Sequence, residues 1–129
     1  MGNNMARVTG IGGVFIKARD AEKLKDWYRV HLGLDIQAWG TSFQWNDPDG
    51  TTAWNVFPAT TKYFDPSSAS FMINYRVADL RGLLATLRAE GVTVDDKVES
   101  SDFGDFGWVM DCEGNRVELW QPPAAKLPG

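Results

Sequence analysis

The sequence predicts an α+β fold in which one chain of 129 residues contains two βαβββ modules. Three observations support this fold class. The hydrophobic pattern repeats at an offset of 59 residues when Asp20 is placed over Asp79. In each half, a helical period of 3.6 residues gives way to the alternating period of strands. Each half also carries a turn tetrapeptide, at 47–50 and 111–114, before its last strand.

One amphipathic helix of about three turns is predicted in each module, because apolar residues recur at i, i+3 and i+4. Asp20 and Asp79 occupy the N-cap positions, where a carboxylate accepts hydrogen bonds from free backbone N–H groups. Gly33 and Gly91 stand where the helices end. The helices are expected over 21–32 and 80–91.

One strand precedes each helix and three follow it. The predicted strands are 13–18, 34–39, 41–46 and 52–57 in the first module and 72–77, 92–99, 106–111 and 116–121 in the second. We treat 1–129 as a single domain, with module one over about 8–58, a linker over about 58–70 and module two over about 70–122.

The composition excludes several classes of function. A net charge of −4 argues against nucleic acid as a partner. Cys112 is the sole cysteine, which excludes an internal disulfide and a cysteine-rich zinc site. The single histidine, His31, excludes mechanisms that need two. Neither end resembles a signal peptide and no apolar run approaches 18 residues, so we expect a cytoplasmic protein without a membrane partner.

Two sequence motifs resemble the vicinal oxygen chelate superfamily, which includes glyoxalase I, bleomycin- and fosfomycin-resistance proteins and extradiol dioxygenases. One is the helix ending Trp27-Tyr28…His31-Leu32-Gly33-Leu34, and the other is Asp111-Cys112-Glu113-Gly114-Asn115-Arg116-Val117-Glu118-Leu119. The resemblance covers about residues 8–122. It implies that the two modules form a cupped mixed sheet with the helices on its outer face.

The resemblance also assigns four positions where relatives hold a divalent metal. These fall on Gly13, Met72, Glu118 and Asn55, with Trp54 as the alternative to Asn55. Glycine offers no side chain, a thioether is a poor ligand for such ions, and a catalytic zinc needs three protein ligands. We therefore predict no cofactor. Because Mg²⁺ keeps several waters, a metal held by Glu118 stays an alternative.

Strand alternation assigns further side chains to the cup, because the apolar set of each strand must pack under the helices. The mixture of rings and a few polar groups is typical of small-molecule sites. In the competing interpretation the rings are plain core, Arg76 pairs with Glu118 and Lys17 points into solvent. The predicted ligand-binding residues are Phe15, Lys17, Asn55, Phe57, Met72, Asn74, Arg76 and Trp120.

The sequence thus predicts a metal-free protein, similar to glyoxalase and bleomycin-resistance proteins, that binds a small organic ligand in an aromatic cup. The resemblance implies a homodimer, in which modules pair within one chain or between subunits. One alternative is a metal-dependent lyase or dioxygenase. Another is a metal-free enzyme with Glu118 as catalytic base and Lys17 or Arg76 stabilising an oxyanion. A third is a structural or partner-binding domain with a filled cup.

Overall fold

The computed structural model describes residues 11–45, 48 and 50–124. Its helices and strands, in chain order, are α1 Ala21–Leu32, β1 Ile73–Arg76, α2 Leu80–Ala89, β2 Glu99–Ser101, β3 Gly104–Met110 and β4 Arg116–Gln121. Within the described ranges, neither helix is both long and apolar enough to cross a bilayer. Both chain ends and two of the four residues of the turn predicted at 47–50 lie outside the described residues.

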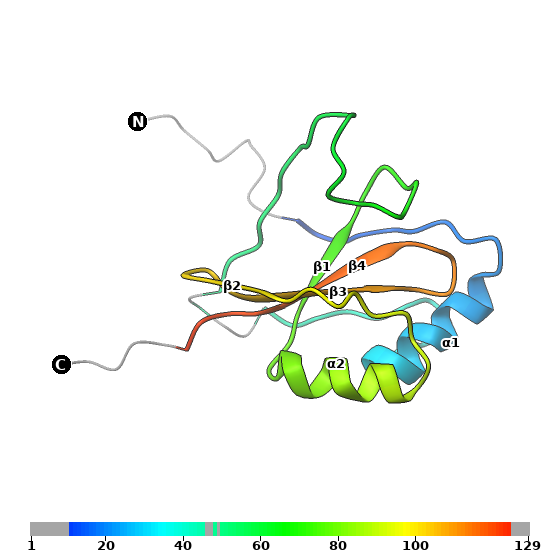
Figure 1. The fold of residues 1–129 in the computed structure, drawn as a ribbon. Helices are drawn as coiled ribbons and strands as arrows, with labels where there is room; N and C mark the ends of the chain where they lie inside the picture. The colour runs from blue at the N-terminus through cyan, green and yellow to red at the C-terminus, as the bar shows by residue number, and fades with distance from the viewer. Residues whose placement is uncertain (1–10, 46–47, 49, 125–129) are drawn as a thin grey trace, which may run out of the picture.

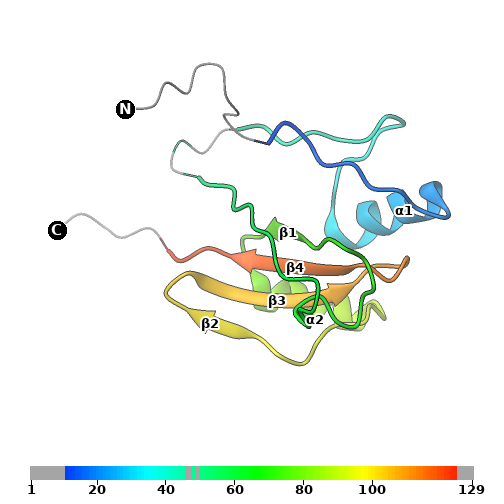
Figure 2. The ribbon, with the colours of Figure 1, turned by 90° about the horizontal axis from the view of Figure 1, so that it is seen from above.

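The four strands form one mixed open sheet in the order β1-β4-β3-β2, which Figure 2 shows face on. β1 runs parallel to β4, whereas β2, β3 and β4 are antiparallel neighbours. The register places Glu118 of β4 directly between Asn74 of β1 and Trp108 of β3. Residues that face each other across a ladder share one side of the sheet, so these three side chains lie on the same face.

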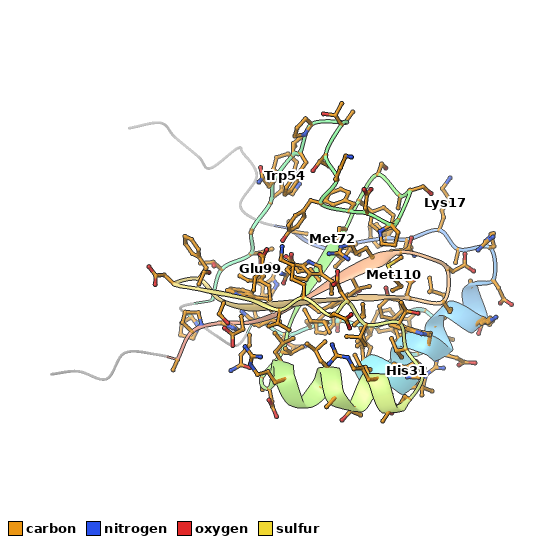
Figure 3. All side chains as sticks on the ribbon, viewed as in Figure 1. Lys17, His31, Trp54, Met72, Glu99 and Met110 are labelled. Atoms are coloured by element: carbon orange, nitrogen blue, oxygen red, sulfur yellow. The ribbon has the colours of Figure 1, made fainter. Side chains whose placement is uncertain are left out.

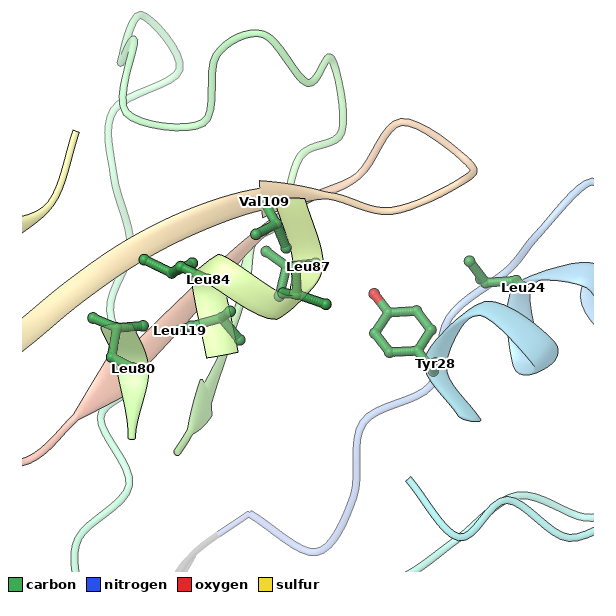
Figure 4. Close-up of a cluster of buried hydrophobic side chains, with 8 residues drawn as sticks. Leu24, Tyr28, Leu80, Leu84, Leu87, Val109 and Leu119 are labelled. Carbon is green, nitrogen blue, oxygen red and sulfur yellow. The ribbon is translucent and has the colours of Figure 1, made fainter. Parts of the chain in front are cut away.

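The helices cover one face of the sheet and the linker crosses the other (Figures 1 and 2). Three buried leucines of α2 pack on the valine and leucine side chains of β3 and β4 (Figure 4). The contact is close because β3 presents Gly107 to the helix: an added Cβ would lie 2.9 Å from Cδ1 of Leu84. The α2 core consists of Leu80, Leu84, Leu87, Val109, Val117 and Leu119.

Both predicted helices and their N-caps are confirmed, but α2 ends two residues earlier than the predicted range of 80–91, with Glu90 as its C-cap. The carboxylate of Asp20 accepts a hydrogen bond from the backbone N–H of Lys23, and that of Asp79 accepts one from Gly82, both at 3.1 Å. Gly33 follows α1 with a φ of 70°, a left-handed conformation that favours glycine. Both helix starts and the end of α1 are therefore fixed by local chemistry.

Polar and aromatic contacts attach α1 to the second module. The hydroxyl of Tyr28 donates to Oδ2 of the buried Asp111 over 2.8 Å. The Tyr28 ring also packs against Tyr75, with centroids 5.9 Å apart. At the end of the helix, Nδ1 of His31 lies 2.8 Å from Oε1 of Glu90, the C-cap residue of α2. The two helices and the sheet therefore share one core.

The first module supplies its helix but not its predicted strands. In the described part of the chain, the segments predicted over 13–18, 34–39, 41–46 and 52–57 form no ladder, apart from a bridge between Gln37 and Gly40. A strand exists only where a neighbour takes up its backbone hydrogen bonds. These segments have no such neighbour, and large apolar side chains along them are exposed: Val14, Phe15, Trp39, Phe43, Trp45, Trp54 and Val56.

In the second module only the strand predicted over 92–99 differs. It is reduced to a bridge between Val94 and Val109, and regular pairing begins at Glu99. The side chain of Asp95 accepts a hydrogen bond from the backbone N–H of Lys97 at 2.9 Å. Such a turn closed by an aspartate competes with the ladder, which explains the interruption.

Candidate functional site

The centre of the candidate site is the Glu118 carboxylate, on the sheet face opposite α2. Glu118 is only 8% exposed. Its Oε2 accepts hydrogen bonds from the Tyr63 hydroxyl at 2.5 Å and from Nε1 of Trp108 at 2.9 Å. Its Oε1 accepts one from Nδ2 of Asn74 at 2.8 Å. Burial removes the hydrogen bonds that water would donate to this carboxylate, and three neutral donors of the protein replace them.

One cation on this face, Arg116, is already engaged. The guanidinium of Arg116 lies over the Trp108 ring, 5.1 Å from its centroid. Its Nη1 pairs with Oδ2 of Asp95 at 3.2 Å. Among the described residues, Glu118 has no ion-pair partner. The site is thus an acceptor surrounded by rings and neutral donors.

Tyr63 reaches this site from the linker, which runs across the sheet in Figures 1 and 2. Its ring is stacked on Phe57, with centroids 5.5 Å apart and planes 9° apart. It stands edge-on to Trp108, with centroids 6.1 Å apart and planes 89° apart. Burial, and next the hydrogen bond to Glu118, raise the pKa of Tyr63, so its hydroxyl remains a proton donor at neutral pH.

A second ring pair extends the apolar floor towards the β2–β3 turn. Phe106 and Trp120 are stacked, with centroids 6.2 Å apart and planes 15° apart. Nε1 of Trp120 donates to the Phe103 carbonyl at 2.7 Å, which fixes the orientation of the indole. The face therefore offers flat apolar surface beside one carboxylate.

The structure brings together part of the predicted cup. The side chain of Asn74 donates a hydrogen bond to Glu118, and the Phe57 ring stacks on Tyr63, which itself donates to Glu118. Arg76 pairs in register with Trp120 on the same face. Within the described residues, Arg76 forms no ion pair with Glu118. The half-buried Met72 lies just before β1, on the linker side of the sheet in Figure 3.

Three predicted residues from the first module do not reach this face. Phe15 is 97% exposed. Lys17 is exposed and points away from the sheet in Figure 3. The side chain of Asn55 is exposed and accepts a hydrogen bond from the neighbouring Val56 N–H. Their placement in the cup presupposed strands that the described part of module one does not form.

Sequence reasoning missed two residues of the site, Trp108 and Tyr63. Extending the alternation to the strand predicted over 106–111 would have found Trp108, since it lies opposite Glu118. Tyr63 had no comparable signal. It lies in an irregular segment without periodicity, so only the tertiary structure shows which face it contacts.

The residues around Glu118 do not fit a divalent metal. Its hydrogen-bond partners are an indole, a phenol and an amide, and an indole N–H has no lone pair to offer. No three His, Cys, Asp or Glu side chains gather into a metal-sized cluster in the described part of the chain. His31 lies among the helices, on the other side of the sheet (Figure 3).

A separate hollow of about 270 Å³ lies beside β1, near the end of α1. It is lined on the sheet side by Tyr75 and Leu119, which face the helices, and on the other side by Leu34 and Phe43. Glu118 is not part of its wall.

Comparison with known proteins gives structural matches only: neither a model of a known protein family nor a curated protein matches the sequence. The chain is similar to TnmS3, an antibiotic binding protein from Streptomyces sp. CB03234, at 26% identity. That match covers 90% of this chain and all of TnmS3, with a TM-score of 0.57.

Two other matches are more distant. TioX from Micromonospora sp. ML1 has 15% identity over 84% of this chain and 92% of its own, with a TM-score of 0.48. A glyoxalase/bleomycin resistance protein/dioxygenase from Alicyclobacillus acidocaldarius has 14% sequence identity. That match covers 88% of this chain and 93% of the other, with a TM-score of 0.48.

The mixed open sheet with both helices on one face makes this a small α+β protein, and this architecture is consistent with the glyoxalase/bleomycin-resistance fold. The match to TnmS3 supports the resemblance to the vicinal oxygen chelate superfamily that the sequence predicts.

Proposed function

We propose that this chain is a metal-free binding protein that holds a small organic molecule on the aromatic face around Glu118. The observation that carries the proposal is the buried Glu118 carboxylate, with three neutral donors and no paired cation in the described residues. A buried acceptor beside flat apolar surface is a means of orienting an aromatic ligand. The similarity to TnmS3, whose name describes an antibiotic binding protein, supports the same class of function.

The same geometry favours binding over the catalytic alternatives. A general base must take up the substrate proton, whereas three of the roughly four lone pairs of the Glu118 carboxylate already accept hydrogen bonds. Lys17 does not reach the face, so it cannot stabilise an oxyanion there. A metal-dependent lyase or dioxygenase would need donors that the face does not offer.

Fluorescence can test the proposal, because Trp108 and Trp120 both face the cup. We expect neutral flat compounds such as naphthalene, quinoline or acridine to quench tryptophan emission and to raise the thermal midpoint by mass action. Trp120→Ala should weaken binding on the order of tenfold, because a stacking surface is lost. Trp54→Ala is the matched control, since Trp54 is 77% exposed.

Two outcomes would contradict the proposal. One is the absence of binding by every compound in the panel. The other is an equal effect of the two tryptophan substitutions, which would place the bound compound outside the cup.

We also propose that the protein works as a homodimer, in which a second copy covers the extended segments of the first module. Those segments carry large apolar side chains in solvent, among them Phe15 and Trp45 at 97% and 88% exposure. Contiguous exposed apolar surface and unpaired extended backbone are typical of association sites. Among the described residues, β1 pairs with β4 alone, so its other edge can accept a strand.

Sedimentation velocity tests the assembly. We expect a dimer for the wild type and a shift towards monomer for Phe15→Ser. Phe103→Ser is the control, because Phe103 is also exposed, at 75%, but lies in the β2–β3 turn. A wild-type monomer at all concentrations would overturn this part of the proposal without affecting ligand binding.

A further inference from the structure

The contacts of Tyr63 amount to a complete recognition site for a phenol. The hydroxyl donates to a carboxylate oxygen at 2.5 Å, within the range of short charge-assisted hydrogen bonds. One face of the ring is stacked on Phe57, and the Trp108 ring lies edge-on to it. Stacking, edge contact and a buried acceptor are the elements that a binding site needs to select a hydroxylated ring.

The acceptor is held independently of Tyr63. Nε1 of Trp108 donates to the same oxygen of Glu118, and Nδ2 of Asn74 donates to the other. Both donors belong to strands on either side of β4, and Trp108 is only 1% exposed. If the Tyr63 hydroxyl moved away, the Glu118 side chain would keep its position, and one lone pair of its Oε2 would become available to another donor.

Tyr63, in contrast, belongs to a segment that is bonded mainly to itself. The backbone hydrogen bonds of residues 58–70 join Thr61 to Pro58, Asp65 to Lys62 and Ser67 to Phe64. In the described part of the chain, the hydrogen bond from Tyr63 to Glu118 is the only one that joins this segment to the sheet. The segment can therefore move away without breaking any strand pairing.

We propose that Tyr63 occupies the ligand site from within the chain, and that the natural ligand is a flat aromatic molecule with a phenolic hydroxyl that displaces it. The inference rests on the proposed binding function and specifies its ligand class. The incoming hydroxyl takes over the hydrogen bond to Oε2 of Glu118, and the incoming ring takes the place between Phe57 and Trp108.

The charge of the site defines what it rejects. Glu118 has no ion-pair partner among the described residues, and Arg116 on the same face is already paired with Asp95. An aromatic acid would bring a second negative charge to this face, and an aryl ether would bring no donor. Phenols should therefore bind in preference to benzoates, ethers and plain hydrocarbons of the same size.

The test uses p-cresol, which is the tyrosine side chain as a free molecule, in calorimetric titrations of the full chain. We expect Tyr63→Ala to bind p-cresol about tenfold or more tightly than the wild type, because the internal competitor is removed. Toluene, 4-methylanisole and p-toluate should bind this variant about tenfold or more weakly than p-cresol. The double variant Tyr63→Ala, Glu118→Gln should lose much of this preference for p-cresol over the other three compounds. Val30→Ala, at an exposed side chain of α1, should leave p-cresol affinity unchanged.

The outcomes separate this inference from the broader function. If toluene binds Tyr63→Ala as well as p-cresol does, the phenol assignment is wrong and the aromatic cup stands. If p-cresol binds the variant no better than the wild type, displacement of Tyr63 is wrong. If none of these compounds and none of the flat aromatics binds, both proposals fail. Should Tyr63→Ala lose its far-ultraviolet circular dichroism, Tyr63→Phe decides, since it keeps the ring and must still bind p-cresol more tightly than the wild type.

Discussion

The hydroxyl of Tyr28 on α1 donates a hydrogen bond to Oδ2 of Asp111, a residue 83 positions away in the β3–β4 turn. Both residues are about 5% exposed. Asp111 also accepts hydrogen bonds from the backbone N–H groups of Glu113 and Asn115, and from Nδ2 of Asn115. The contact therefore joins the helix of the first module to the turn that sets the β3–β4 register.

The first prediction concerns the strength of this contact. Tyr28→Phe should lower the free energy of unfolding by about 1.5–3 kcal/mol, because a buried hydrogen bond to a charged group is lost. Urea denaturation measures the change. A double-mutant cycle with Asp111→Ala isolates the pair, and we expect a coupling energy of about 0.5–3 kcal/mol. A coupling energy near zero would mean that the two residues stabilise the fold independently.

How far the sequence predicts the fold depends on the range of the interactions. Asp20 and Asp79 were predictable as caps because an N-cap bonds to residues only three positions away. The strand ending at Gln121 was predictable because its alternation is supported by a turn. The strands of the first module were not, because alternation describes a side-chain pattern whereas a ladder also needs a neighbouring backbone.

The second prediction compares two glycines of the second module. Gly104 and Gly114 both have positive φ, at 112° and 83°. A Cβ at Gly114 would meet open space, whereas one at Gly104 would collide with the backbone carbonyl of Gln121. Gly114→Ala should cost about 1–2 kcal/mol from the backbone conformation alone. Gly104→Ala should cost about 1–3 kcal/mol more, from the clash.

Thermal or urea unfolding of the two variants gives the comparison directly. Equal destabilisation would show that β4 can shift away from the β2–β3 turn without loss of stability, in conflict with the close approach described above.

The candidate site was also predictable only in part. Glu118 and Asn74 were found because both lie in regular strands whose alternation assigns each residue to one face. Tyr63 depends on the path of an irregular linker, which no sequence periodicity describes. Phe15 and Lys17 failed to reach the cup because their strand has no ladder among the described residues. The face on which a side chain lies was thus predictable where backbone pairing fixes its direction.

The third prediction concerns acid. Asp95 accepts a hydrogen bond from the Lys97 backbone N–H and pairs with Arg116, and these contacts hold its pKa below its usual range. A depressed pKa in the folded state means that Asp95 stabilises the fold above its unfolded pKa of about 4. That contribution is lost as the pH falls through the lower, folded-state pKa.

Asp95→Asn should therefore reduce the free energy of unfolding at pH 7 and make little difference at a pH about two units below the unfolded pKa. Urea denaturation across this range measures the trend. Asp96→Asn serves as the control, because Asp96 is the exposed neighbour and, within the described residues, makes no ion pair. A constant difference between Asp95→Asn and wild type at all pH values would assign its effect to packing instead of charge.

The fourth prediction concerns alkali. Burial raises the pKa of Tyr28, Tyr63 and Tyr75 above the ordinary value. The neighbouring carboxylates raise it further, Asp111 at Tyr28 and Glu118 at Tyr63. Because the folded-state pKa values are raised, this contribution to stability is complete below an unfolded pKa of about 10 and is lost as the pH rises above it. Ionisation of these phenols therefore favours the unfolded chain.

Phenolate absorbance and circular dichroism should then change together in an alkaline titration. At a pH of about 10.5, where a free tyrosine is mostly ionised, the folded protein should show little phenolate. At higher pH the phenolate signal should appear steeply, as the fold is lost. Tyr63→Phe should remove the phenolate absorbance that Tyr63 contributes. Phenolate absorbance and circular dichroism should still change together in this variant, because Tyr28 and Tyr75 lie in the core. A gradual phenolate titration centred near pH 10, in a protein that keeps its circular dichroism, would mean that the tyrosine hydroxyls are open to solvent.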